Sequence, residues 1–225
     1  MVKRDDMKGI ITHEESQTVT IAFRNKGYEF YSNDIKDCSG GHPEWHIKDS
    51  CFNVLCKNPL RYDFMGSHPV CQFLANSGVR WLASKKEKPG FEWSDKYQIY
   101  INPIRFKQME DAALHFKSVL SWVETIGKGY VENPIMHKYA MEIIGVKPTQ
   151  IIQPYQFGHT TTKATCLWLV GLPKLEPTEI IKKELRTDEI HKCPPGKERA
   201  TIRSKTFPGI AKAMTDQWIT THLLH

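Results

Sequence analysis

Residues 9–34, GIITHEESQTVTIAFRNKGYEFYSND, contain the pattern that decides the fold. Residues 9–12 are a short apolar run of the kind found in strands, and residues 28–34 form a second strand pattern. Between them, apolar residues recur on one face of a helix that Gly27 can end. A strand, a helix and a strand in so short a stretch predict the crossover unit of a parallel sheet.

The rest of the chain continues to alternate strand and helix patterns. Five apolar runs bounded by Gly, Pro or Asn predict further strands, at residues 51–55, 62–67, 129–133, 149–158 and 164–172. Helical spacing of apolar residues predicts a long helix over residues 109–126 and a closing helix near residues 208–218. The prediction is an α/β fold, a doubly wound, mostly parallel sheet that binds ligands at the carboxyl ends of its strands. Residues 83–104 and 173–206 are predicted to be irregular.

Composition predicts one soluble domain. A length of 225 residues suits a single domain spanning residues 1–225. The net charge of +6 suits a polyanionic partner, although its spread-out lysines and arginines are equally typical of a solvated surface. The six cysteines show neither a CxxC pair nor a paired Cys/His spacing, so no metal site and no disulfide framework is predicted. We find no signal peptide or membrane span, and expect a cytoplasmic protein without a membrane partner.

Cys71 is the candidate nucleophile. In residues 62–78, YDFMGSHPVCQFLANSG, it follows a predicted strand and a tight turn at His68 and Pro69. Only a thiolate adds to an electron-poor carbon, so the pKa of a normal cysteine, about 8.5, must fall. A helix beginning after Cys71 could lower that pKa. The alternative is that Cys71 is a small buried hydrophobic residue.

Glu132 is the candidate acid. In YVENP, residues 130–134, Glu132 and Asn133 end another predicted strand and would face the same crevice as Cys71. To protonate or hydrogen-bond a ring nitrogen, the carboxyl must have a pKa that burial has raised. The alternative is a strand-end glutamate exposed to water. His68 and His137 adjoin the site and could carry protons, but we expect each to make a structural hydrogen bond.

These motifs resemble those of a known enzyme family. SHPVCQFLANSG resembles the Pro-Pro-Cys-Gln loop of cytosine-C5 DNA methyltransferases, and YVENP is similar to their Glu-Asn-Val element. Other segments resemble short bacteriophage-type members of the family: EESQTVTIAFRNKGYEFYSNDI, SGVRWL, ENPIMHKYA, QIIQPYQFGHTTTKATCLWL and RSKTFPGIAKAMTDQW. The resemblance covers most of residues 10–218. It implies a class I S-adenosylmethionine-dependent methyltransferase-like fold.

The resemblance also implies where the cofactor and the reaction are located. It implies S-adenosylmethionine as cofactor, bound by residues of the loops that follow the first strands: Glu14, Glu15, Ser16, Gln17, Asp34, Asp49, Ser50 and Pro69. Asp34 would accept the ribose hydroxyls, as an acidic residue does in dinucleotide-binding folds, although Asp37 is also available. Catalysis would use Cys71 at C6 of a cytosine and Glu132 at its N3, with Asn133 beside them.

Substrate contacts are less defined by the resemblance. Candidates are the polar and basic residues Gln72, Arg80, Gln156, His159, Lys163, Arg203 and Lys205. Each basic residue among them also fits an ordinary surface position. An aromatic and basic loop with Phe91, Trp93, Lys96 and Tyr97 is a further candidate for contacting DNA.

Three departures from the family pattern leave alternatives open. The first loop carries acidic EES where the family has a glycine-rich signature, and Val70 and Pro134 replace a proline and a valine of the two motifs. Only residues 173–206 stand where the family has a long target-recognition region. We therefore expect methylation of cytosine in DNA, with two alternatives. One is modification of a free nucleotide or single strand; the other is a non-catalytic module that binds nucleic acid or another protein.

Overall fold

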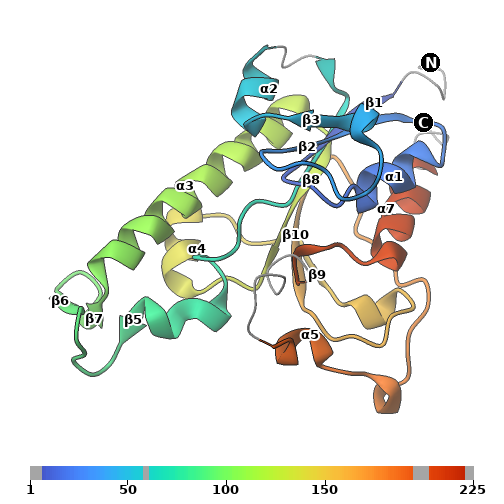
Figure 1. Cartoon of the computed structure of the whole chain (residues 1–225). Coiled ribbons are helices and arrows are strands. Elements are labelled where there is room, and N and C mark those ends of the chain that lie inside the picture. The colour runs from blue at the N-terminus through green and yellow to red at the C-terminus, as the bar shows by residue number, and fades with distance from the viewer. Residues whose placement is uncertain (1–6, 58–60, 195–202, 221–225) are drawn as a thin grey trace.

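A seven-stranded sheet forms the centre of the fold in the computed structural model, which describes residues 7–57, 61–194 and 203–220 (Figure 1). Its strands are β1 (Lys8–Thr12), β2 (Glu29–Asp34), β3 (His46–Lys48), β4 (Phe64–Ser67), β8 (Gly129–Pro134), β9 (Gln150–Ile152) and β10 (Thr165–Val170). Their spatial order is β3-β2-β1-β4-β8-β10-β9. The first five pair in parallel, and β10 runs antiparallel to both β8 and β9. The expected α/β fold with a mostly parallel sheet is confirmed.

The crossover unit predicted from residues 9–34 is present. Helix α1 (Thr18–Arg24) connects β1 to β2, and the two strands pair in parallel along their length. Phe23 of α1 stacks on Phe30 of β2 with ring centroids 4.0 Å apart, and both rings are fully buried. Burial of this aromatic pair holds α1 against the sheet.

Helices cover both faces of the sheet (Figure 1). On one face lie α2 (Cys51–Lys57), α3 (Pro103–Ile126) and α4 (Lys138–Ile144), whose buried residues share one hydrophobic cluster with Ile10 of β1. On the other face lie α1 and α7 (Pro208–Thr220), which share a second cluster with Ile11. The side chains of the neighbouring residues Ile10 and Ile11 thus pack on opposite faces of the sheet, because successive side chains of a strand alternate between its two faces.

Helix α3 confirms the long amphipathic helix and begins earlier than predicted. Asn102 caps it by accepting a hydrogen bond from the Arg105 amide at 3.0 Å, and Pro103 occupies its first position. Gly127, with φ of 83°, ends it in the left-handed region that favours glycine. Within the parts of the chain that the structure describes, no helix has both the length and the apolar character to cross a membrane.

The strand predicted at residues 51–55 was wrong, because this segment is helix α2. The reason lies just before it, where Asp49 Oδ1 accepts hydrogen bonds from the Ser50 amide at 2.7 Å and from Asn53 Nδ2 at 2.9 Å. An aspartate in this position supports a helix start, whereas the short apolar run CFNVL is compatible with either structure.

Other elements differ from the prediction in extent. The strand predicted at residues 149–158 is interrupted at Pro154, so β9 is short and a 3₁₀ turn, η4 (Pro154–Gln156), follows it. Strand β3 and helix α4 were not predicted. Residues 83–104, predicted to be irregular, contain a three-stranded antiparallel sheet in the order β5-β7-β6, built from β5 (Ala83–Ser84), β6 (Glu92–Ser94) and β7 (Ile99–Ile101).

The segment after β10 returns along the edge of the sheet. Leu175 exchanges two hydrogen bonds with the side chain of Gln150 in β9, and the backbone of residues 178–181 bonds to that of η4. Farther on, Thr187 bonds to the backbone at Thr160 and Thr162. A 3₁₀ turn, η5 (Lys183–Leu185), and a short helix, α5 (Glu189–Lys192), interrupt the irregular course expected of residues 173–206.

We predict that Gly66→Ala in β4 destabilises the protein by about 1–3 kcal/mol, because a methyl group added to a packed core must displace its neighbours. A Cβ at this position would lie 2.6 Å from Tyr130 Cε1 and 2.7 Å from Ile11 Cδ1. Urea denaturation measures the effect. The control is Gly78→Ala, whose Cβ would lie 3.6 Å from its nearest neighbour; equal losses in both variants would contradict the packing described here.

Candidate active site

The direction of chain progression in the sheet reverses between β1 and β4. From β1 the chain proceeds to β2 and β3 on one side, and then returns to place β4 on the other side of β1. In open α/β sheets, ligands bind outside the carboxyl ends of the strands at such a reversal. The loop after β1 contains the predicted cofactor residues 14–17, and the loop after β4 contains Pro69 and Cys71, so these two groups leave the sheet from neighbouring strands. The other predicted cofactor residues lie at the end of β2 and after β3.

The cysteine loop, residues 68–76, is bonded to the chain that leaves β8. The contacts that join them are Asn133 Nδ2 to the Pro69 carbonyl at 2.8 Å, His137 Nε2 to the Phe73 carbonyl at 2.9 Å, the His137 amide to the Leu74 carbonyl at 3.0 Å, and the Asn76 amide to the Ile135 carbonyl at 2.8 Å. Both motifs of the family resemblance are therefore parts of one hydrogen-bonded unit. Asn133, predicted to be catalytic, positions the cysteine loop.

The two histidines have the structural roles expected. His137 donates through Nε2 to the Phe73 carbonyl, and its Nδ1 accepts from the Ala140 amide at 3.2 Å, which caps α4. His68 Nε2 lies 2.8 Å from the hydroxyl of Tyr130. Burial lowers the pKa of His68 to about 3. Because His68 is neutral at physiological pH, it holds the loop and does not act as a proton carrier there.

Cys71, Glu132 and Lys163 interact electrostatically. Burial raises the pKa of the Cys71 thiol and the charge of Glu132 raises it further, whereas the cations of Lys163 and Arg203 lower it. Burial also raises the pKa of Glu132, against the opposing effect of Lys163. Cys71 therefore lies within electrostatic range of Glu132, but the expected low pKa of Cys71 is wrong. The loop after Cys71 is a tight turn rather than an α-helix, and burial dominates.

The reversed strand β10 places Lys163 beside Glu132. Because β10 is antiparallel to β8, its first residue, Thr165, pairs with Pro134 at the end of β8. Lys163, two residues earlier, thus reaches the carboxyl edge of the parallel strands. The two side chains share a cavity of about 10 Å³, which is enough for about one water molecule. Its other lining residues come from the start of β10, from the segment leading into α7 and from α7 itself: Thr165, Thr206, Phe207, Ile210 and Met214.

Two of the predicted substrate residues have structural roles instead. His159 Nε2 accepts a hydrogen bond from the Gly209 amide at 2.9 Å and so secures the first turn of α7. Gln156 Oε1 accepts from the Gln153 amide at 2.7 Å and stabilises η4. Both side chains are therefore engaged in hydrogen bonds within the fold, whereas the positive charges of Lys163 and Arg203 lower the pKa of Cys71.

The remaining predicted substrate residues lie on the surface. Gln72 and Lys205 are exposed, and the guanidinium group of the exposed Arg80 lies 5.2 Å from the centroid of the Trp81 ring. Of the aromatic and basic loop, Trp93 on β6 is half exposed, whereas Tyr97 packs against the rings of Phe106 and Tyr139.

Glu14 organises the loop after β1. Its carboxylate accepts hydrogen bonds from the Val19 amide at 2.6 Å, the Thr20 amide at 3.3 Å and the Thr20 hydroxyl at 2.6 Å. These donors belong to the first turn of α1, whose amides need acceptors. The predicted cofactor residue Glu14 thus caps a helix. Burial raises its pKa to about 7 despite these hydrogen bonds.

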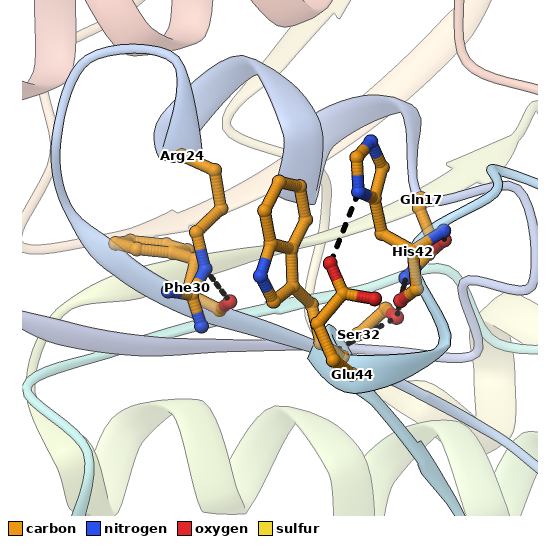
Figure 2. Close-up of polar contacts among 7 residues, drawn as sticks. Gln17, Arg24, Phe30, Ser32, His42 and Glu44 are labelled. Carbon is orange, nitrogen blue, oxygen red and sulfur yellow. Dashed lines mark hydrogen bonds and ion pairs between the residues drawn. The ribbon is translucent and has the colours of Figure 1, made fainter.

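Gln17 joins this loop to the segment after β2, as Figure 2 shows. Its Nε2 donates to Ser32 Oγ at 3.1 Å and to the His42 carbonyl at 2.8 Å, and its Oε1 accepts from the His42 amide at 3.1 Å. The ring of His42 stacks on that of Trp45 at 3.8 Å. Gln17 is buried, so its predicted role in binding the cofactor is indirect: it shapes the wall of the crevice.

Some of the other predicted cofactor residues are held by hydrogen bonds within the protein, and others are partly exposed. The Asp49 carboxylate is held by Ser50, Asn53 and Lys57. Ser16 Oγ lies 3.2 Å from Thr18 Oγ1, at one end of a groove of about 410 Å³ between α1 and α7. Asp34 Oδ1 accepts from the Lys36 amide at 3.0 Å, and the side chain is partly exposed at the crevice. The Pro69 carbonyl is bonded to Asn133.

Buried acceptors without partners lie at the ends of three strands. Glu15 Oε1 follows β1, Asn33 Oδ1 belongs to β2, and Asn133 Oδ1 belongs to β8. A buried acceptor of this kind calls for a donor, from water or from a ligand. The ammonium and ribose hydroxyl groups of an adenosyl amino acid are such donors. Glu15 is one of the predicted cofactor residues, and Asn33 precedes another, Asp34, so these acceptors lie where the cofactor is predicted to bind.

Comparisons with protein-family models and with curated sequences assign no family to the chain. No protein-family model matches the chain, and no curated protein sequence is significantly similar to it.

We predict that Glu14→Gln makes the protein's stability less sensitive to pH. The pKa of Glu14 rises from 4.5 to about 7 on folding, so its contribution to stability is full below pH 4.5 and is lost as the pH rises through 7. Relative to wild type, the variant should gain about 2 kcal/mol between pH 5 and pH 8, measured by urea denaturation at each pH. Glu124→Gln, on the exposed side of α3, is the control. A stability difference between wild type and Glu14→Gln that is constant with pH would refute this account.

Proposed function

We propose that the protein transfers a methyl group from S-adenosylmethionine to C5 of cytosine in DNA, through a transient covalent bond between Cys71 and C6 of the base. The observation that carries the proposal is the joint action of Glu132 and Lys163 on Cys71, from the ends of three different strands. The mostly parallel sheet with its reversed strand β10 agrees with the class I methyltransferase fold implied by the motifs.

Cys71 supplies the nucleophile. Its thiolate forms a bond to C6, and the electron pair of the C5–C6 double bond shifts toward C5 and the N3 side of the ring. Lys163 and Arg203 favour the thiolate, whereas burial and Glu132 disfavour it. The site therefore holds Cys71 mainly as the thiol until substrate arrives.

Glu132 supplies the proton that the ring requires. Burial raises its pKa, so a larger share of the carboxyl is protonated near neutral pH than in an exposed glutamate. A protonated carboxyl at N3 stabilises the negative charge that the ring gains when sulfur adds to C6. After transfer, water acts as the base that takes the C5 proton. The C5–H electron pair forms the C5–C6 double bond again, and the C6–sulfur bond breaks, with its pair returning to Cys71 as the thiolate.

The cofactor, when bound, supplies the electrophilic methyl group. Glu15, Asn33 and Asp34 would hold it at the ends of β1 and β2, next to the cysteine loop. The neighbouring Gln17 and Glu14 keep the two loops in place through the bonds described above.

Access for a base requires movement of one segment. The cavity of about 10 Å³ beside Glu132 is too small for a pyrimidine ring, and Thr206 and Phe207 close it. A cytosine in a duplex must also leave the base stack, at a free-energy cost of a few kcal/mol. Displacement of the segment leading into α7, which contributes Thr206 and Phe207 to the lining, would enlarge the space beside Glu132 and Lys163.

A second candidate is modification of a free pyrimidine nucleotide or a single strand. The short stretch of residues 173–206 between β10 and α7 favours it, because little chain is present to contact a duplex. Single-stranded bases need no extraction from a stack.

The proposal predicts that label from methyl-labelled S-adenosylmethionine enters duplex DNA containing cytosine. Cys71→Ser should reduce transfer to background, because serine is a far weaker nucleophile, while calorimetry shows unchanged binding of the cofactor. Cys56→Ser, at an exposed position on α2, is the control and should retain activity. Label that appears only in mononucleotide or single-stranded cytosine would favour the second candidate, and transfer by Cys71→Ser would remove Cys71 from the mechanism.

The proposal also predicts a change of pH profile in Glu132→Gln. In wild type the active form carries a protonated Glu132 and an ionised Cys71, so kcat/KM should fall at both low and high pH. The amide of glutamine does not titrate, so kcat/KM of the variant should instead rise with pH to a plateau. At neutral pH the variant should be about 10²- to 10⁴-fold less active than wild type. The rise should follow a Cys71 pKa that is lower than in wild type, because the charge of Glu132 is gone. A variant profile that remains bell-shaped with unchanged limbs would exclude Glu132 as the acid.

A further inference from the structure

Three side chains that the proposed reaction does not use meet on the α2 and α3 side of the crevice. His13 follows β1, Cys51 is the first residue of α2, and His115 lies midway along α3. Their ligand atoms all lie within 4.8 Å of one another. The closest pair is His13 Nε2 and His115 Nε2, which are 3.0 Å apart.

We infer that His13, Cys51 and His115 form a binding site for a divalent transition-metal ion, with zinc as the best match. Two imidazoles and one thiolate are ligands that zinc prefers, and three protein ligands leave a fourth position open. Tetrahedral zinc with Zn–N bonds of about 2.0–2.1 Å requires nitrogens roughly 3.4 Å apart. The two Nε2 atoms are already within about 0.4 Å of that spacing.

A hydrogen bond to Ser67 orients the ring of His13, as is usual for a histidine that binds a metal. His13 Nδ1 lies 3.0 Å from Ser67 Oγ, which in turn accepts a hydrogen bond from the Thr12 hydroxyl at 2.7 Å. When His13 Nδ1 donates to Ser67, the lone pair of Nε2 faces the other two ligands. Metal-binding histidines characteristically donate their second nitrogen to such a partner. The backbone of His13, with φ of 57°, holds the ring in this place in a conformation that non-glycine residues seldom adopt.

His115 and Cys51 are held from the other side. The ring of Phe52, next to Cys51, makes an edge contact with the His115 ring at 5.1 Å, and His13 makes a second edge contact at 5.1 Å. A hydrogen bond between the two histidines accounts for their own contact, but it does not require the thiol of Cys51 at the same point. A metal ion accounts for all three groups.

Charge balance also suits a divalent ion. The carboxylate of Asp34 lies within electrostatic reach of Cys51. One thiolate and one nearby carboxylate together offset two positive charges, and a buried charge must be offset in this way. The bound ion would tie the loop after β1 to α2 and α3, and so fix one wall of the crevice.

Titration of the full-length, chelator-treated, tag-free protein with cobalt and with zinc tests the site without any assay of catalysis. Cobalt should bind at one ion per chain, with the visible bands of a tetrahedral complex and a near-ultraviolet sulfur-to-cobalt band, and zinc should displace it. Cys51→Ser should lose the sulfur-to-cobalt band, whereas Cys56→Ser on the same helix should keep it. Zinc should raise the melting temperature of wild type and of Cys56→Ser.

Two further variants keep the test decisive if Cys51→Ser fails to fold. His115→Asn removes a ligand from a partly exposed helix position and should weaken cobalt binding by at least about tenfold, and Ser67→Ala should weaken it about tenfold through the orientation of His13. No cobalt binding by wild type, a sulfur band that survives in Cys51→Ser, or equal affinity in wild type and His115→Asn would each overturn the site. None of these results depends on whether the protein methylates DNA.

Discussion

The hydrogen bonds between the cysteine loop and the chain leaving β8 are the constraint on which the candidate active site depends. Asn133 and Pro69 are 64 residues apart, so no local preference brings Cys71 and Glu132 together. The sheet places the two strand ends nearby, and the side chains of Asn133 and His137 then set their distance. Both of those side chains are buried, so their bonds do not compete with water and the loop has one geometry.

A buried carboxyl gives the first loop a role different from that of a glycine-rich turn. A glycine-rich turn lets the backbone approach a ligand and leaves the amides of the following helix free to bind it. Here Glu14 accepts the amides of Val19 and Thr20, and α1 is stabilised from within. Glu15 and Asn33, after β1 and on β2, instead carry buried oxygens that have no hydrogen-bond partner among the described residues. An acidic loop attracts an ammonium group by charge and repels a phosphate.

The sequence predicted the elements with strong periodicity and missed those that depend on context. The β1–α1–β2 unit and α3 followed from apolar spacing alone. Helix α2 was mistaken for a strand because the short run CFNVL fits both structures, and the local bonds of Asp49 to Ser50 and Asn53 were not recognised in the sequence. The small β5-β7-β6 sheet was missed because its strands are only two or three residues long, too short to show a period.

The same distinction applies to the candidate site. Cys71 and Glu132 could be proposed from sequence motifs, and Lys163 from the segment that precedes β10. Each of the three lies at or near the end of a strand that the sequence predicts. The structural role of His159 could not be proposed in this way, since its partner, the Gly209 amide, lies 50 residues away and only the fold brings it near. The partner of Gln156 is the amide of Gln153 in the same 3₁₀ turn, a local contact that the motif-based prediction overlooked. The cluster of His13, Cys51 and His115 was also invisible, because its members come from three distant elements and show no ligand spacing along the chain.

The return of the chain along the edge of the sheet after β10 has a consequence for specificity. Since β10 ends at the edge of the sheet away from Cys71, the chain must travel back before Arg203 can act on the thiol. Bonds to Gln150, to η4 and to Thr160 guide that path as far as Thr187. No strand of the described sheet follows β10 along the chain, so an insertion after Thr187 would leave every one of those strands in place. The architecture therefore has a position at which a binding element could be gained, exchanged or lost without rebuilding the sheet.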